Sequence, residues 1–206
     1  MKLSAVADEY RALFSTAVIS PRRIGEVDAA ITRIMLHQDQ YLAVEKAVTR
    51  LADGAVIGTV PWYVIALIHN LECSLNFGQH LHNGDSLARP THNDPAGRPP
   101  GWLDFPEEQR TWLRSAVDAL RYDRLDQYTD WDVARICYCF ETFNGWGYRG
   151  HGIHSPYLWA GTQHYTRGKY VRDGVYASEA VSEQIGSGVL LLRMTERNLV
   201  SLRAAV

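Results

Sequence analysis

The stretch that decides the fold reads Pro61-Trp-Tyr-Val-Ile-Ala-Leu-Ile-His-Asn-Leu-Glu72-Cys-Ser-Leu-Asn-Phe77 and continues as Gly78-Gln-His-Leu-His-Asn-Gly-Asp85. Its first part predicts a buried helix, because apolar residues recur at helical spacing and fill most positions between, and Pro61 suits a first helical turn. A helix that is apolar on nearly all sides belongs in a protein core. Glu72 stands in its last turn, where a carboxylate is costly to ionise unless it finds partners or its pKa rises. Such a carboxyl group can serve as a general acid near neutral pH.

The sequence on both sides of this stretch predicts further helices. Apolar residues recur at helical spacing, and Pro or Gly follows several of these runs, as at helix ends. The expected helical regions are 3–18, 23–51 with a break near 37–40, 61–73, 105–120, 131–143 with Asp130 as its N-cap, and 189–202. Two Gly-rich segments, 78–104 and 144–159, interrupt them. Loops of this length inside a compact domain are usually functional or contain a small hairpin.

We therefore expect one mainly α domain over residues 1–206, in which a small hairpin or loop region flanks an active-site cleft. N-terminal helices would occupy residues 1–55, and a C-terminal helical extension would occupy residues 177–206. The sequence shows no repeat, low-complexity tract or linker that would divide the chain.

Composition excludes several classes of function. The 206 residues are 46% hydrophobic and 21% charged, with a formal net charge of −2, so bulk charge gives no reason to expect nucleic-acid binding. No apolar run reaches the length of a membrane span. Three cysteines are too few for a disulfide framework and fit reduced thiols. No signal peptide is recognisable, so we expect synthesis in the cytoplasm and action at a cell wall after delivery by lysis, a holin or a secretion system.

A possible pair of carboxylates points to chemistry on sugars. Asp85 follows Glu72 by 13 residues and lies in a polar Asn-Gly-Asp turn. One buried and one solvated carboxylate are the equipment of glycoside hydrolysis, in which the buried acid protonates the leaving oxygen and the ionised group assists water or stabilises positive charge. The high content of Trp and Tyr is compatible with a sugar-binding cleft as well as with core packing.

Three motifs occur here in the order found in one enzyme family. Glu72-Cys-Ser74, followed by Leu81-His-Asn-Gly-Asp85, resembles goose-type lysozymes and their lytic-transglycosylase relatives, in which a helix ends in Glu-Ser and an Asn-Gly segment leads to an Asp. Phe143-Asn-Gly-Trp-Gly147 is similar to the Tyr-Asn-Ala-Gly motif of that family. Tyr170-Val-Arg-Asp-Gly-Val-Tyr176 is similar to the tyrosine-rich helix that closes its domain. The resemblance covers residues 60–176.

This resemblance implies a lysozyme-like α+β fold and a glycosidase that cleaves β-1,4 bonds of an amino-sugar polymer, with peptidoglycan as the first candidate. Glu72 would be the general acid, Asp85 the second carboxylate, and Asp94 its reserve. The candidate substrate-binding residues are Ser74, Asn144, Tyr148, Tyr157, Trp159, Tyr165 and Tyr170. The expected partner is a polysaccharide; no cofactor, metal, nucleic acid or membrane span is expected, and the sequence does not predict the oligomeric state.

Several alternatives stay open at this point. A lytic transglycosylase would use one Glu as acid and then as base, and a chitinase or chitosanase would share the fold class. A non-catalytic cell-wall-binding protein is the alternative from another class. The histidines around 69–92 and 151–164 are a rival metal site, although they lack a His-Glu-x-x-His arrangement. Cys73 is a weak rival nucleophile, and Glu141 is a competing acid that we expect to pair with Arg149 or Arg135.

Overall fold

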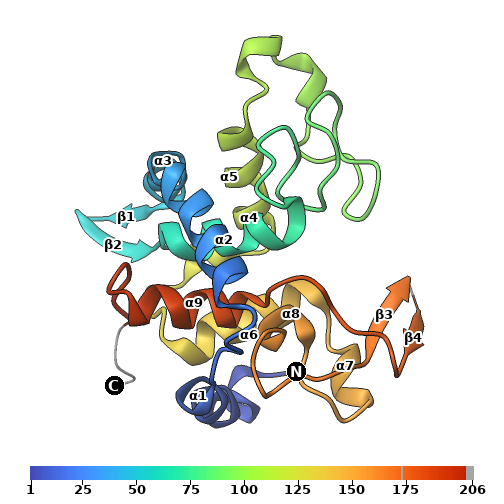
Figure 1. Ribbon diagram of the computed structural model, residues 1–206. Helices are drawn as coiled ribbons and strands as arrows, with labels where there is room; N and C mark the ends of the chain where they lie inside the picture. The colour runs from blue at the N-terminus through green and yellow to red at the C-terminus, as the bar shows by residue number, and fades with distance from the viewer. Residues whose placement is uncertain (173, 203–206) are drawn as a thin grey trace. The chain divides into compact units, whose positions relative to one another are not determined.

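The computed structural model describes residues 1–172 and 174–202, and this part of the chain is mostly helical (Figure 1). The mainly α prediction is confirmed. The chain forms two compact units: unit 1 comprises Met1–Thr32 and Asp130–Val206, and unit 2 comprises Arg33–Thr129. Helix α2 (Ile24–Leu36) spans the division and ends before His37, where the sequence predicted a break. The single domain expected over residues 1–206 stays a prediction.

Unit 2 is built on three packed helices. Its elements are α3 (Gln38–Val48), β1 (Arg50–Ala52), β2 (Ala55–Gly58), α4 (Trp62–Cys73), η2 (Trp102–Asp104), η3 (Glu107–Gln109), α5 (Trp112–Tyr122) and η4 (Leu125–Gln127). Helix α3 packs against both α4 and α5. Eight of the twelve residues of α4 are buried, as its apolar sequence predicts. The long loop after α4 lies beside the first half of α5 (Figure 1), where the imidazole of His80 and the hydroxyl of Ser115 are 2.8 Å apart.

A hairpin replaces the end of the second predicted helical region. The sequence favoured a helix to residue 51, but α3 ends at Val48, and β1 pairs antiparallel with β2. Asp53 and Gly54 join the strands with φ of 50° and 80°. Two consecutive positive φ angles match the twist of a tight hairpin and are typical of an Asp-Gly pair. Asp-Gly therefore marks a strand turn here and not a helix end.

Unit 1 packs its helices around α6. Its elements, besides the first part of α2, are η1 (Leu3–Ala5), α1 (Ala7–Thr16), α6 (Val133–Asn144), α7 (Gly147–Gly150), α8 (Pro156–Trp159), β3 (Lys169–Arg172), β4 (Val175–Ala177) and α9 (Ser187–Glu196). Helix α6 packs against α1 and α8, and α8 packs against α9. The N-cap of α6 is Asp132, whose side chain accepts from the backbone N–H of Arg135 at 2.9 Å. Asp130, the predicted cap, instead pairs with the Arg135 guanidinium.

The segment 170–176 differs from the expectation. Its resemblance to a tyrosine-rich helix predicted a helix, but β3 and β4 form an antiparallel hairpin next to α7, with Tyr170 opposite Tyr176 (Figure 1). Gly174 has a φ of 67°, which favours a turn over a helix at this point. The C-terminal extension predicted over 177–206 contains one helix, α9, within its described part, and residues 203–206 lie outside the described residues.

Among the described residues, no helix combines the length and the apolar character needed to cross a membrane.

Candidate functional site

Glu72 lies in the last turn of α4, immediately before a sharp reversal of the chain. Cys73 completes the helix, and the two residues after it, Ser74 and Leu75, have left-handed φ angles of 50° and 62°. The backbone N–H groups of both Ser74 and Leu75 donate to the carbonyl of His69, which closes the helix. Left-handed backbone at residues other than glycine costs of order 1 kcal/mol each and often marks functional positions.

Ser74, a predicted substrate-binding residue, is the C-cap of α4. Its carbonyl accepts a hydrogen bond from Nη2 of Arg33 at 2.8 Å. This bond and the helix cap give the residue a structural role at the point where α4 turns into the loop.

The loop that carries Asp85 is locked against the end of α4. Gly84 has a φ of 77°, and a Cβ atom built on it would lie 2.8 Å from the carbonyl oxygen of Glu72. The backbone N–H of His80 donates to the carbonyl of Asp85 at 2.6 Å, and the Cys73 thiol contacts the carbonyl of His80 at 3.3 Å. Only glycine allows this approach, so the loop holds a fixed position on the helix that ends in Glu72.

The carboxylate of Asp85 organises the same loop. Its Oδ2 accepts from the backbone N–H groups of His92 and Asn93 at 2.9 and 3.0 Å and from Nδ2 of Asn83 at 3.0 Å. Its Oδ1 accepts from Nδ2 of Asn93 at 2.7 Å, and His92 Nδ1 lies 3.1 Å from Oδ2. Although burial opposes ionisation, these donors lower the pKa of Asp85. Both carboxylate oxygens of Asp85 therefore accept hydrogen bonds, with most of the donors on Oδ2 and one on Oδ1.

Asp94, the reserve carboxylate, is in a different environment. Asp94 is exposed, and its backbone carbonyl accepts a hydrogen bond from Nδ2 of Asn83 at 3.4 Å. Within the described part of the chain its side chain forms no hydrogen bond. Asp85 and Asp94 thus belong to one loop, with one carboxylate buried and bonded and the other open to solvent.

The rival nucleophile and the rival metal site receive no support. Burial raises the pKa of the Cys73 thiol to about 12, which keeps it protonated at neutral pH. His69, His80 and His82 contact Tyr41, Ser115 and Asp118, respectively, at 2.8–3.0 Å. Within residues 1–172 and 174–202, no group of three His, Cys, Asp or Glu side chains is arranged to hold a metal ion.

Three predicted binding residues of unit 1 line a pocket of about 430 Å³, which we name the tyrosine pocket. Asn144 ends α6, and its Nδ2 donates to the Ser155 hydroxyl at 3.2 Å. The Tyr148 hydroxyl accepts from the backbone N–H of Tyr170 at 3.3 Å, and the two rings meet edge to face with centroids 5.1 Å apart. Burial raises the pKa of Tyr148, so its hydroxyl stays protonated and able to donate.

The surroundings of Tyr170 include residues that the sequence did not single out as binding residues: Gly147, which lines the tyrosine pocket, and His151 and Tyr176, which lie behind Tyr170. Gly147 lies so close to Tyr170 that an added Cβ would be 2.6 Å from its hydroxyl oxygen. His151 bonds that hydroxyl at 3.1 Å and stacks on Tyr176 with ring centroids 3.6 Å apart. The Gly-x-Gly spacing at residues 145–147 was the available signal, since closely approached backbone often requires glycine.

The other predicted aromatic residues lie outside the tyrosine pocket, and two of them are in the core. Trp159 is 1% exposed and Tyr165 is 8% exposed, and neither lines the tyrosine pocket. The Tyr165 hydroxyl donates to the carbonyl of Gly168 at 3.2 Å and accepts from the backbone N–H of Ser182 at 3.0 Å. Tyr157 is half-buried on α8, and its carbonyl accepts from Ser187.

Glu141, the competing acid, is part of a buried cluster. Its carboxylate accepts two hydrogen bonds from Arg149, both at 2.9 Å, and one from the Tyr10 hydroxyl at 2.5 Å. Arg149 also pairs with Glu9 at 2.9 Å. The predicted pairing of Glu141 with Arg149 is confirmed, and Glu141 is a structural carboxylate of unit 1.

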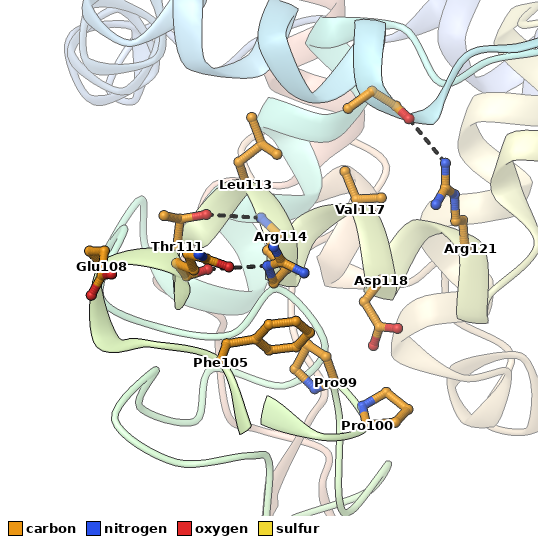
Figure 2. Close-up of a pocket in the computed structure, with 12 residues that line it drawn as sticks. Pro99, Pro100, Phe105, Glu108, Thr111, Leu113, Arg114, Val117, Asp118 and Arg121 are labelled. Atoms are coloured by element: carbon orange, nitrogen blue, oxygen red, sulfur yellow. Dashed lines mark hydrogen bonds between the residues drawn. The ribbon is translucent and has the colours of Figure 1, made fainter. Parts of the chain in front are cut away.

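Unit 2 has a pocket of about 590 Å³ between α5 and the segment 99–111, which we name the α5 pocket (Figure 2). Figure 2 shows the Arg114 guanidinium above the Phe105 ring, and its central carbon lies 4.0 Å from the ring centroid. Pro99 and Pro100 line the pocket beside Phe105. The sequence reasoning missed this pocket; the seven-residue spacing of Arg114 and Arg121 on an amphipathic helix was the available signal.

The predicted site residues therefore divide between the units. Unit 2 contains Glu72, Ser74, Asp85 and Asp94; unit 1 contains Asn144, Tyr148, Tyr157, Trp159, Tyr165 and Tyr170. Comparison of the chain with protein-family models, with curated proteins and with solved structures found no significant match.

Proposed function

We propose that this chain is a lysozyme-like glycosidase that cleaves β-1,4 bonds of an amino-sugar polymer, with peptidoglycan as its substrate. The observation that carries the proposal is the end of α4, where Glu72 precedes a left-handed reversal and the loop of Asp85 closes onto its carbonyl. A strained, over-determined backbone around one acidic residue is typical of a site that must hold a proton donor in place. The order of the motifs along the chain adds support.

In the proposed reaction Glu72 acts as the general acid. Its carboxyl group gives a proton to the glycosidic oxygen while the bond from that oxygen to the anomeric carbon breaks, which leaves an oxocarbenium-like sugar and a Glu72 carboxylate. Water then adds to the anomeric carbon, and the proton that it loses returns to the Glu72 carboxylate, directly or through solvent. Taken by itself, the tyrosine pocket of unit 1 contains flat rings, hydroxyl groups and the amide of Asn144, which suit the faces and acetamido groups of amino sugars.

We assign Asp85 a positioning role in this reaction. A general base must accept a proton from water, and donors from residues 83, 92 and 93 already engage both carboxylate oxygens of Asp85. Its lowered pKa also makes it a weak base. This observation favours a second candidate, lytic transglycosylation, in which Glu72 acts as acid and then as base while a hydroxyl group of the substrate attacks.

Product analysis on purified peptidoglycan tests the proposal. Wild-type protein should release soluble fragments, and Glu72→Gln, which keeps the shape of the side chain but carries no acidic proton, should lower the rate by about 100-fold or more. Fragments with a free reducing end indicate hydrolysis, and fragments lighter by one water indicate transglycosylation. If the wild type binds peptidoglycan but releases no fragments, the proposal of an enzyme is contradicted, and a non-catalytic wall-binding protein becomes the better interpretation. Release from chitin or chitosan alone would contradict the assigned substrate.

A further inference from the structure

The α5 pocket presents two guanidinium groups from one face of a helix. Arg114 and Arg121 are seven residues apart on α5, which places them on the same side with about 10.5 Å between them along the helix axis. Neither forms a salt bridge with any residue that the structure describes. Arg98, which lies near the pocket, differs from them because it pairs with Asp118.

The two groups are held in place by contacts that leave donors unused. The Arg114 guanidinium rests on the Phe105 ring, and its Nε donates to the carbonyl of Gln109 at 3.1 Å. Arg121 donates through Nη2 to the carbonyl of Ala47 at 3.1 Å, a bond drawn in Figure 2. Within the described residues, the terminal nitrogens of Arg114 and Nη1 of Arg121 have no acceptor. Groups fixed in this way lose less conformational entropy when a ligand binds.

The acidic groups of the pocket do not neutralise these arginines. The carboxylate of Asp118 accepts from Arg98 at 2.6 and 3.0 Å and lies 2.9 Å from the His82 ring nitrogen. Glu108 is exposed, lies across the pocket from Arg121 in Figure 2, and forms no salt bridge with a described residue. The pocket therefore retains a capacity for anions, and guanidinium groups prefer planar carboxylates or phosphates.

The walls indicate that the anion belongs to a peptide. Pro99, Pro100, Phe105 and Val117 form apolar surface between and beside the arginines. An extended peptide advances about 3.3–3.6 Å per residue, so the spacing of the arginines corresponds to about three residues. A short peptide with carboxylates at that separation would contact both guanidinium groups and lay its backbone over the apolar wall.

We propose that the α5 pocket binds the stem peptide of peptidoglycan through carboxylate contacts to Arg114 and Arg121. The identity of this peptide rests on the proposed function, because peptidoglycan is the amino-sugar polymer whose chains bear short peptides with free carboxylates. Chitin lacks such groups and chitosan is cationic. The pocket would then favour peptide-bearing glycan, although none of its lining residues takes part in bond cleavage.

Titration of the full chain with a synthetic Ala-γ-Glu-Lys-Ala tetrapeptide, whose two carboxylates are about three residues apart, tests the proposal by NMR without requiring cleavage. Replacing Arg114 or Arg121 by Gln should weaken binding about threefold each, and replacing both should weaken it about tenfold, as expected for partly exposed charge pairs. Arg22→Gln, which removes an exposed arginine of unit 1, should leave the affinity unchanged. Arg114→Lys keeps the charge but loses the planar stacking, and should lie between wild type and Arg114→Gln.

The same peptide with both carboxylates amidated is the matched ligand control. It should bind the wild type no better than the acidic peptide binds the double variant. Equal binding of the acidic and amidated peptides, or equal affinity of the wild type and a double variant with a normal unfolding midpoint, would overturn the proposal.

The outcome is separable from that of the proposed function. Because Glu72 is outside the α5 pocket, Glu72→Gln should bind the tetrapeptide with wild-type affinity. Cleavage of peptidoglycan without measurable tetrapeptide binding would overturn the stem-peptide site and leave the glycosidase standing. Arginine-dependent tetrapeptide binding without cleavage of any glycan would support the site and refute the glycosidase.

Discussion

Replacing Asp85 by Asn should destabilise the protein, and replacing it by Ala should destabilise it more, because the Asp85 carboxylate accepts the hydrogen bonds that hold its loop. The wild-type carboxylate receives hydrogen bonds from two backbone N–H groups and two asparagine side chains. Asp85→Asn can keep one oxygen toward the backbone donors if the Asn93 side chain turns over, but it removes the negative charge. Asp85→Ala removes every acceptor.

The size of each effect follows from these bonds. A hydrogen bond to a charged group contributes about 1.5–3 kcal/mol and a neutral one about 1 kcal/mol, so loss of the charge alone should lower the free energy of unfolding by about 2 kcal/mol. In Asp85→Ala the donors of His92, Asn93 and Asn83 lose their partner and are rehydrated only in part. A loss of about 4 kcal/mol is expected there, at about 1 kcal/mol for each donor.

Urea unfolding at several pH values measures both effects. The folded protein lowers the pKa of Asp85, so its stabilising contribution is present above the unfolded pKa of about 3.9 and is lost as the pH falls through the lower folded pKa. The difference between wild type and Asp85→Asn should therefore be full at pH 7 and should shrink below about pH 4.

Asp94→Asn is the matched control, because it makes the same change on an exposed side chain of the same loop. It should change the free energy of unfolding by less than about 0.5 kcal/mol. If Asp85→Asn is as stable as Asp94→Asn at pH 7, or if its deficit persists at pH 2.5, the carboxylate does not hold the loop and the reasoning is refuted.

Three further experiments test other contacts. Gly84→Ala should lower the free energy of unfolding by about 2 kcal/mol, because a Cβ with positive φ would meet the Glu72 carbonyl; Gly97→Ala, also at positive φ but with open space, should cost about half as much. Asp118→Asn should cost about 2 kcal/mol at pH 7, since Arg98 and His82 lose their shared partner, and a urea midpoint equal to the wild type would contradict this. Native Cys73 should resist a thiol reagent at pH 8 and react after unfolding, because burial raises its pKa to about 12; rapid native labelling would refute its burial.

The helix that ends in Glu72 was predictable because burial leaves a strong local pattern. Apolar side chains at helical spacing fix both the type of element and its core position, and α4 begins directly after Pro61. The reversal at Ser74 and Leu75 was not predictable, because neither residue favours left-handed backbone and the hydrogen bonds to the His69 carbonyl come from the folded helix end. Local sequence does not encode strain that packing imposes.

The partner of a carboxylate was predictable only where it lies nearby in the sequence. Arg149 follows Glu141 by eight residues across the end of α6, and this proximity predicted their ion pair. The donors of Asp85 arise from a loop whose course depends on contacts across unit 2, such as the bond from Thr91 to Arg98. The hairpin at 170–176 was missed for a similar reason, since a tyrosine pattern alone does not separate a short helix from paired strands.

Variants of Asp85 and Asp94 also distinguish hydrolysis from lytic transglycosylation, the two routes of the proposed reaction. A second carboxylate that activates water needs a free oxygen. Within the described structure the carboxylate of Asp94 accepts no hydrogen bond, whereas both oxygens of Asp85 already accept them. We therefore expect Asp85→Asn to keep kcat within about threefold of wild type at temperatures where it is folded, because a positioning residue acts through stability and not through proton transfer. A loss of about 100-fold in kcat by folded Asp85→Asn would make Asp85 the general base. If Asp94→Asn alone shows that loss, hydrolysis uses Asp94; if neither variant does, Glu72 must act as both acid and base, and the products should be those of transglycosylation.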